Sequence, residues 1–218
     1  MKLAAKIFSI VFHPLFLPLI ALPIYFSVGS YQNLILAQAD DQFLYAIYSV
    51  MVSVGVLFPL LSLYIMTRTG LLSDFNAYHQ KERPPIFFIV LIYYLLVYFM
   101  YRSWNNSIYH LLDPLLSFLT GGIVLMGGCF LINFKWKISL HSTAISALSA
   151  AFLAFSITLG ELENPIFLLV VNVLLIFLIG LVSSSRLILK AHLKHEVYLG
   201  IILGFFVEFI VVYLKISI

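Results

Sequence analysis

The sequence is poor in charged residues. Asp, Glu, Lys and Arg make up 10% of its 218 residues, whereas a soluble domain carries about 25%. Hydrophobic residues make up 63%. A compact soluble fold of this length could not bury that much apolar surface, because surface shrinks too slowly with size. The composition therefore excludes an ordinary soluble domain and favours a chain surrounded by lipid.

Cysteine and long polar stretches are also scarce. Cys129 is the only cysteine, so no disulfide can form within the chain. The longest polar stretch, Thr67 to Pro84, is too short to fold as a soluble domain. The net charge of +3 gives no reason to expect a nucleic acid as partner. We therefore predict a single transmembrane domain over residues 1–218.

Long apolar runs are what the sequence has in abundance. About 20 such residues span a hydrocarbon core of about 30 Å. Seven runs predict an all-α fold, a polytopic membrane helical bundle with six to seven transmembrane helices: 7–29, 43–66, 85–101, 114–134, 138–159, 165–184 and 197–214. Pro14, Pro18 and Pro23 each remove a backbone donor from the first run, so we expect this helix to be kinked or interrupted.

Positive charge is distributed unequally between the two ends of this predicted bundle. Counted from the amino terminus, one end holds the amino terminus, the 67–84 loop, the 135–137 turn and the 185–196 segment. That end holds ten of the 12 Lys and Arg residues: Lys2, Lys6, Arg68, Lys81, Arg83, Lys135, Lys137, Arg186, Lys190 and Lys194. Arg102 and Lys215 lie at the other end. Because Lys and Arg accumulate on the cytoplasmic side of membrane proteins, we predict that the first end is cytoplasmic.

Histidines gather at the same end. Five of the six map there: His13, His79, His141, His192 and His195. Imidazoles and basic groups at one membrane surface suit an anionic substrate that needs acid–base or nucleophilic help. For the lysines, anchoring to lipid headgroups is the favoured explanation. Anchoring does not explain the histidines, which therefore indicate a functional site.

Three short segments at this end contain the polar residues of interest. They are Lys81-Glu82-Arg83-Pro84, Lys137-Ile138-Ser139-Leu140-His141-Ser142 and the stretch from Ser185 to Glu196. In the third, His192 and Glu196 are four residues apart, so on a helix they would share a face and could hydrogen-bond. A carboxylate on one imidazole nitrogen leaves the other free to attack. Arg186 adds a fork of donors that suits phosphate oxygens.

The three segments resemble, in order, the motifs of the type 2 phosphatidic acid phosphatases (PAP2), a family that shares its fold with vanadium haloperoxidases. Those motifs are Lys-x6-Arg-Pro, Pro-Ser-Gly-His and Ser-Arg-x5-His-x3-Asp. The third segment keeps every spacing, with Glu196 in place of the aspartate. The second keeps Ser139 and His141, and the first keeps the Arg-Pro pair at 83–84. The resemblance implies a PAP2-like core over about residues 70–215.

This resemblance implies a metal-independent lipid phosphatase that needs no cofactor. His192 would attack phosphorus and form a phosphohistidine, Glu196 would orient it, and His141 would protonate the leaving oxygen. The phosphate would be held by the other polar side chains of the motifs: Arg83, Arg186, Ser139, Lys81 and Lys137. The substrate would be a lipid phosphate or an isoprenoid diphosphate whose tail stays among the membrane lipids. We expect a bacterial inner membrane, with the site facing the cytoplasm.

Departures from the motifs leave other functions open. Asn76 replaces the first lysine, Leu140 replaces a glycine, and Glu196 is one methylene longer than aspartate. These changes fit a catalytically lapsed PAP2-fold scaffold or a lipid-binding protein. His195 with His192 has the spacing of a metal pair, but zinc sites usually need a third protein ligand, and the two arginines favour an anion.

Two polar residues lie inside predicted spans. Glu208 and Asn172 would suit a transporter, although the sequence lacks the internal repeat common in transporters. An ionised side chain in the centre of a span costs at least about 2.5 kcal/mol. We therefore expect Glu208 to face the bundle or to be protonated, and we favour a satisfied contact between helices.

Overall fold

The computed structural model describes residues 1–38, 41–74, 80–159 and 164–214. Asn76, His79 and Lys215 lie outside the described residues. The described part is helical, with no strand. Its elements are α1 (Lys2–Val11), η1 (Pro14–Phe16), α2 (Leu17–Ser27), α3 (Tyr31–Leu36), α4 (Asp41–Val50), η2 (Met51–Leu57), α5 (Phe58–Arg68), η3 (Gln80–Glu82), α6 (Arg83–Ser107), α7 (Asp113–Asn133), α8 (Leu140–Thr158), α9 (Pro165–Ile188) and α10 (Lys194–Tyr213).

Six of the predicted spans are present as helices long and apolar enough to cross a membrane. They are Asp41–Arg68, which joins α4, η2 and α5, and then Gln80–Ser107, Asp113–Asn133, Leu140–Thr158, Pro165–Ile188 and Lys194–Tyr213. The described fold is thus an all-helical bundle of the kind expected for an integral multi-pass membrane protein. The third span extends beyond the predicted end at 101, because Arg102 is part of α6 and its guanidinium donates to the Tyr98 hydroxyl at 2.9 Å.

The first predicted span is interrupted, as its prolines suggested. α1 ends at Val11, and the chain bends by 42° before the helical stretch Pro14–Ser27. His13 lies in the break with an extended backbone, and its Nδ1 accepts a hydrogen bond from the Leu15 N–H at 3.3 Å. The bend brings α1 against α9 and η1 against α8. It therefore places Ser9 and His13 beside residues far away in the sequence.

Helix α8 is the central helix of the bundle. Its apolar stretch is 72% buried, compared with 28–44% for the other five spans. α10 packs closely on it because Gly200 and Gly204 bring no side chain to the contact. A Cβ at Gly200 would lie 2.7 Å from the Thr143 hydroxyl, and one at Gly204 would collide with the Thr143 carbonyl. This small-xxx-small spacing is typical of helix pairs in membranes.

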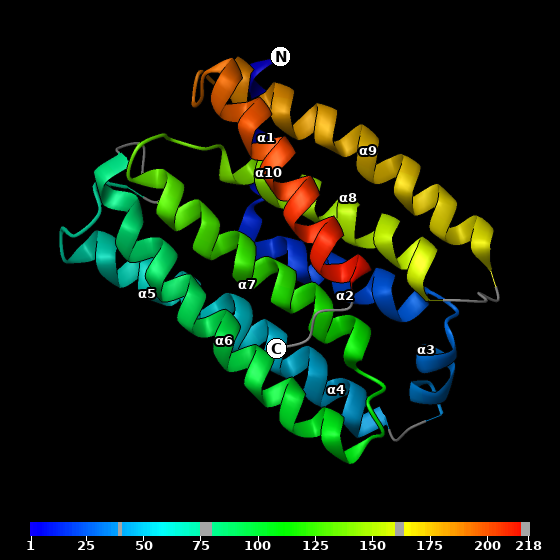
Figure 1. The fold of residues 1–218 in the computed structure, drawn as a ribbon. Helices are drawn as coiled ribbons and strands as arrows, with labels where there is room; N and C mark the ends of the chain where they lie inside the picture. Colours follow the sequence, from blue (N-terminus) through cyan, green and yellow to red (C-terminus); the bar gives the residue numbers. More distant parts are fainter. Residues whose placement is uncertain (39–40, 75–79, 160–163, 215–218) are drawn as a thin grey trace.

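The loops share ends as the crossing count predicted. In Figure 1 the amino terminus, the end of α9 and the start of α10 meet at the top, and the end of α5, the start of α6 and the connection between α7 and α8 lie at the same end of the bundle. Helix α3 and the start of α4 lie at the opposite end. The three polar segments of the sequence are therefore neighbours in space.

The two intramembrane polar residues differ in their surroundings. The Asn172 amide donates to the Ser156 hydroxyl of α8 at 2.7 Å, which satisfies one group between helices. Glu208 is fully buried and faces the bundle, as expected. The expected interhelical hydrogen bond is absent, since neither carboxyl oxygen has a partner among the residues that the structure describes. Prediction from the sequence was wrong on this point, because no periodicity shows which side chains a given helix face meets.

Candidate functional site

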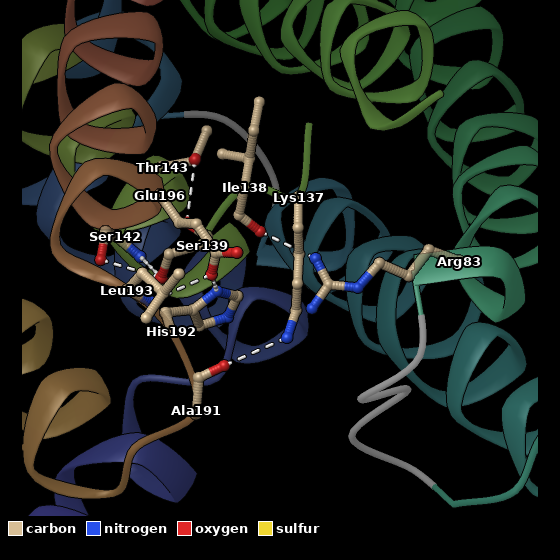
Figure 2. A network of polar contacts seen from close by, with 10 residues as sticks. All are labelled: Arg83, Lys137, Ile138, Ser139, Ser142, Thr143, Ala191, His192, Leu193 and Glu196. Atoms are coloured by element: carbon tan, nitrogen blue, oxygen red, sulfur yellow. Dashed lines mark hydrogen bonds and ion pairs between the residues drawn. The ribbon is translucent and has the colours of Figure 1, made fainter. Parts of the chain in front are cut away.

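Three segments are tied together at one end of the bundle by hydrogen bonds to the backbone (Figure 2). The Arg83 guanidinium, at the start of α6, donates to the Ile138 carbonyl at 2.8 Å. The Lys137 ammonium donates to the Ala191 carbonyl at 3.2 Å, and the Ser139 N–H donates to the Glu196 carbonyl at 3.2 Å. These bonds join the three motif segments of the sequence into one site.

His192 and Glu196 form a close pair. Their Nδ1 and Oε2 atoms lie 2.7 Å apart, and only 3% and 11% of the two side chains are exposed. The predicted contact is present, but the predicted helical reason for it is wrong, because His192 precedes α10. Glu196 lies in the first turn of α10 and its carboxylate also accepts the Leu193 N–H at 3.2 Å. Capping of the helix start therefore holds the carboxylate against the imidazole.

The surroundings of His192 keep its imidazole uncharged. Burial lowers the pKa of His192 to about 4, with Arg83, Arg186 and Lys137 acting in the same direction, while the hydrogen bond with Glu196 opposes them. A neutral imidazole has one N–H, and a carboxylate only accepts, so the proton lies on Nδ1. Nε2 is left with its lone pair. His192 is therefore oriented as a nucleophile or base.

Lys137 shares this electrostatic environment. Burial, reinforced by Arg83 and Arg186, lowers the pKa of the Lys137 ammonium, and Glu196 opposes the shift. Arg83, Lys137 and Arg186 thus concentrate positive charge around one buried carboxylate. The positive potential of such a cluster favours the binding of a further anion.

The second part of the site comes from α1, which sequence reasoning did not include. The Arg186 guanidinium donates to the Ser9 hydroxyl. The His141 Nε2–H donates to the Ser9 carbonyl at 3.0 Å. His13 packs edge-on against His141, with ring centroids 5.1 Å apart. The placement of His13 at the same end of the bundle was the one sign in the sequence that α1 contributes.

One cavity of about 750 Å³ collects most of these groups. The polar side chains that line it are His13, Arg83, His141, Arg186 and His192. Its other walls are apolar and include Leu15, Leu63 and Phe87. The cavity combines two arginines with two imidazoles predicted to act in catalysis, and beside them an apolar surface. It suits a ligand with an anionic head and a hydrocarbon part.

The other predicted residues are placed differently. Ser139 is fully buried as the N-cap of α8, with its hydroxyl 3.0 Å from that of Ser142, and it does not line the cavity. Lys81 is exposed on η3 and does not line it either. His195 is exposed, whereas His192 is buried. In the described part of the chain, no three His, Cys, Asp or Glu residues gather as a metal site would require.

No protein-family model matches this chain, and neither a curated protein nor a solved structure matches it.

Proposed function

We propose that the chain is a membrane-embedded phosphatase of the PAP2 type that hydrolyses a lipid phosphate or diphosphate through a phosphohistidine. The observation behind the proposal is the His192–Glu196 pair at 2.7 Å, with its neutral imidazole on the same cavity as Arg83 and Arg186. The order and spacing of the three motif segments support the same family. The apolar cavity walls suit a substrate whose tail remains in lipid.

In the first step, Nε2 of His192 attacks phosphorus and the bond between phosphorus and the lipid oxygen breaks. Glu196 stabilises the charge that develops on the imidazole, and the guanidinium groups of Arg83 and Arg186 stabilise the equatorial oxygens. His141, as imidazolium, gives its Nε2 proton to the leaving oxygen and exchanges its bond to Ser9 for one to the substrate. A bound phosphate favours this charged form.

In the second step, water cleaves the phosphohistidine. His141 accepts the proton of the attacking water, the bond between His192 and phosphorus breaks, and inorganic phosphate leaves. The reaction uses only groups of the chain and water. Lys137, bonded to the loop that precedes His192, supports the position of that loop.

The test is turnover of a short-chain and a long-chain lipid phosphate by the purified chain, with His195→Ala as the matched control for His192→Ala. His192→Ala should abolish phosphate release and the acid-labile phosphoenzyme, while the exposed His195 should be replaceable without loss. Chelators should leave the activity unchanged. Equal activity of the two variants, or loss of activity on chelation with rescue by zinc, would contradict the proposal.

A further inference from the structure

A second cavity lies beside the first. Pro14, Met126 and Leu140 line both, and the second comprises about 720 Å³, part of which is open to the outside of the protein. It extends along α8 from Leu140 to Leu148, eight residue steps or about 12 Å of helix, towards the middle of the bundle. Its walls are mostly hydrocarbon, including Leu17, Phe118, Leu119 and Leu125. No Lys, Arg or His is among the described residues that line it.

Among the described residues, Glu208 is the one acidic residue of this lining, which also includes the hydroxyl-bearing Tyr94 and Thr143. It is fully buried, and among the described residues neither of its carboxyl oxygens has a hydrogen-bond partner. A Cβ at Gly121 would lie 2.5 Å from its Oε2, so the carboxyl occupies the space that a side chain there would fill. Tyr94 lines the same cavity. Glu208, packed against Gly121 of α7, is thus a carboxyl without a hydrogen-bond partner among the described residues, in the lining of a mostly apolar cavity.

The chemistry of this site restricts its ligand. Unpaired polar groups in the membrane interior are unfavourable, and ionised ones more so. In its neutral form a carboxyl donates one hydrogen bond and accepts others. A hydrocarbon with a hydroxyl group offers both a donor and an acceptor, and its chain fills the apolar walls. A phosphate does not fit, because no described cation lines this cavity.

We propose that this cavity binds a long-chain alcohol, with Glu208 hydrogen-bonding the alcohol's hydroxyl group. The identity of the ligand rests on the proposed function, since removal of phosphate from a lipid phosphate leaves a lipid alcohol. Because Pro14, Met126 and Leu140 line both, the reaction site and this second cavity are neighbours. The alcohol therefore occupies a site next to the one in which it is formed.

The binding test compares dodecanol with dodecane as stabilisers of the purified full chain. At ten times its dissociation constant, dodecanol should raise the Tm by roughly 3–6 °C, and dodecane should raise it by less. Glu208→Leu should abolish the difference between the two ligands. Glu208→Gln should keep part of it, because an amide still donates and accepts. A larger effect of dodecylamine than of dodecanol, or equal effects of dodecanol and dodecane, would overturn the proposal.

A plug variant with a matched control separates the cavity from general stability. Gly122 lines the cavity, and a Cβ there would have its nearest neighbour, Tyr94, at 4.0 Å. Gly128 is on the same helix α7, does not line the cavity, and a Cβ there would meet nothing within 4 Å. Gly122→Leu should remove the response to dodecanol and Gly128→Leu should keep it. An equal response in both would overturn the proposal.

This measurement needs no turnover, so the two proposals fail separately. A chain that prefers dodecanol but releases no phosphate supports the alcohol site and contradicts the phosphatase. A chain that releases phosphate but shows no preference for dodecanol contradicts only the alcohol site.

Discussion

The Nδ1 of His192 lies 2.7 Å from Oε2 of Glu196, although the histidine lies just before α10 and the glutamate in its first turn. The carboxylate is also fixed by the Leu193 N–H at 3.2 Å. This second hydrogen bond fixes the position of the carboxylate, and a shorter side chain would not reach that position. The length of the Glu196 side chain therefore matters for the geometry of the pair.

Substitution at Glu196 should therefore reduce activity in a fixed order. Glu196→Asp withdraws the carboxylate by about 1 Å and should lower kcat by up to roughly a hundredfold. Glu196→Gln keeps the shape, loses the charge that stabilises the imidazolium, and should be the more severe change. Steady-state kinetics on one lipid phosphate gives the ranking, and thermal unfolding controls for folding. Equal activity of all three proteins would show that Glu196 does not act on His192.

The pH dependence should follow His192. The pKa of His192 is about 4, set mainly by burial and lowered further by Lys137. The imidazole should therefore be protonated, and lose its nucleophilic lone pair, only at acid pH. Lys137→Met removes one lowering charge, so the pKa rises and the acid limb of kcat/KM moves to higher pH. Lys194→Met, at an exposed position, should leave the limb in place. Comparison on the same substrate cancels the ionisation of the substrate itself.

The lowered pKa of His192 should also make the stability of the folded chain depend on pH. In the unfolded chain the pKa of His192 is near its ordinary value of 6.5, whereas in the folded chain it is about 4. Between these values the unfolded state binds more protons, so stability should fall as the pH drops through this window. In His192→Gln, the dependence of Tm on pH between about 6.5 and 4 should be shallower. An unchanged slope would count against the buried neutral imidazole.

Ser9 should matter for anion binding although it lies outside every motif. Its hydroxyl accepts from Arg186, whereas its carbonyl serves His141. Ser9→Ala therefore removes the first contact and keeps the second. A hydrogen bond to a charged group is worth about 1.5 kcal/mol or more, so inhibition by vanadate should weaken roughly tenfold. Ser184→Ala, exposed on α9, should change nothing. Equal inhibition of both variants would exclude a role for Ser9.

A side chain added at Gly204 should disrupt the contact of α8 with α10, whereas one added at Gly180 of α9 should be tolerated. A Cβ at Gly204 would collide with the Thr143 backbone, whereas one at Gly180 meets nothing within 4 Å. Gly204→Ala should destabilise the chain by about 1–3 kcal/mol, and Gly180→Ala should not. Thermal unfolding in detergent measures both. Similar Tm values would mean that the two helices do not pack as described.

Sidedness is tested by cysteine labelling in intact cells. Asn106, in the last turn of α6, and Trp136, between α7 and α8, are both exposed. These two segments lie at opposite ends of the bundle (Figure 1). In a background of Cys129→Ala, an impermeant reagent should modify Asn106→Cys and spare Trp136→Cys, because the lysines and arginines favour a cytoplasmic position for the end that holds His192. The reverse pattern would place the site outside and favour an exported lipid as substrate.

Six of the spans and the shared end of the motif segments were predicted from the sequence alone. Each depends on local quantities, namely the length of apolar runs, the position of charges and the number of crossings between them. The contact of His192 with Glu196 was also predicted, although from a spacing of four residues on a helix that does not include His192. The reason for it was not, since the start of α10 at Lys194 is set by packing and capping.

Contacts between distant segments depended on the tertiary structure. Ser9 and Arg186 are 177 residues apart, and they meet only because α1 bends at His13 and packs on α9. The prolines predict a bend but give neither its direction nor its partner. In the same way, the sequence shows only that Glu208 is a carboxyl group within a predicted span. Its position against Gly121, without a hydrogen-bond partner among the described residues, depends on how α7, α8 and α10 pack together, which no local pattern records.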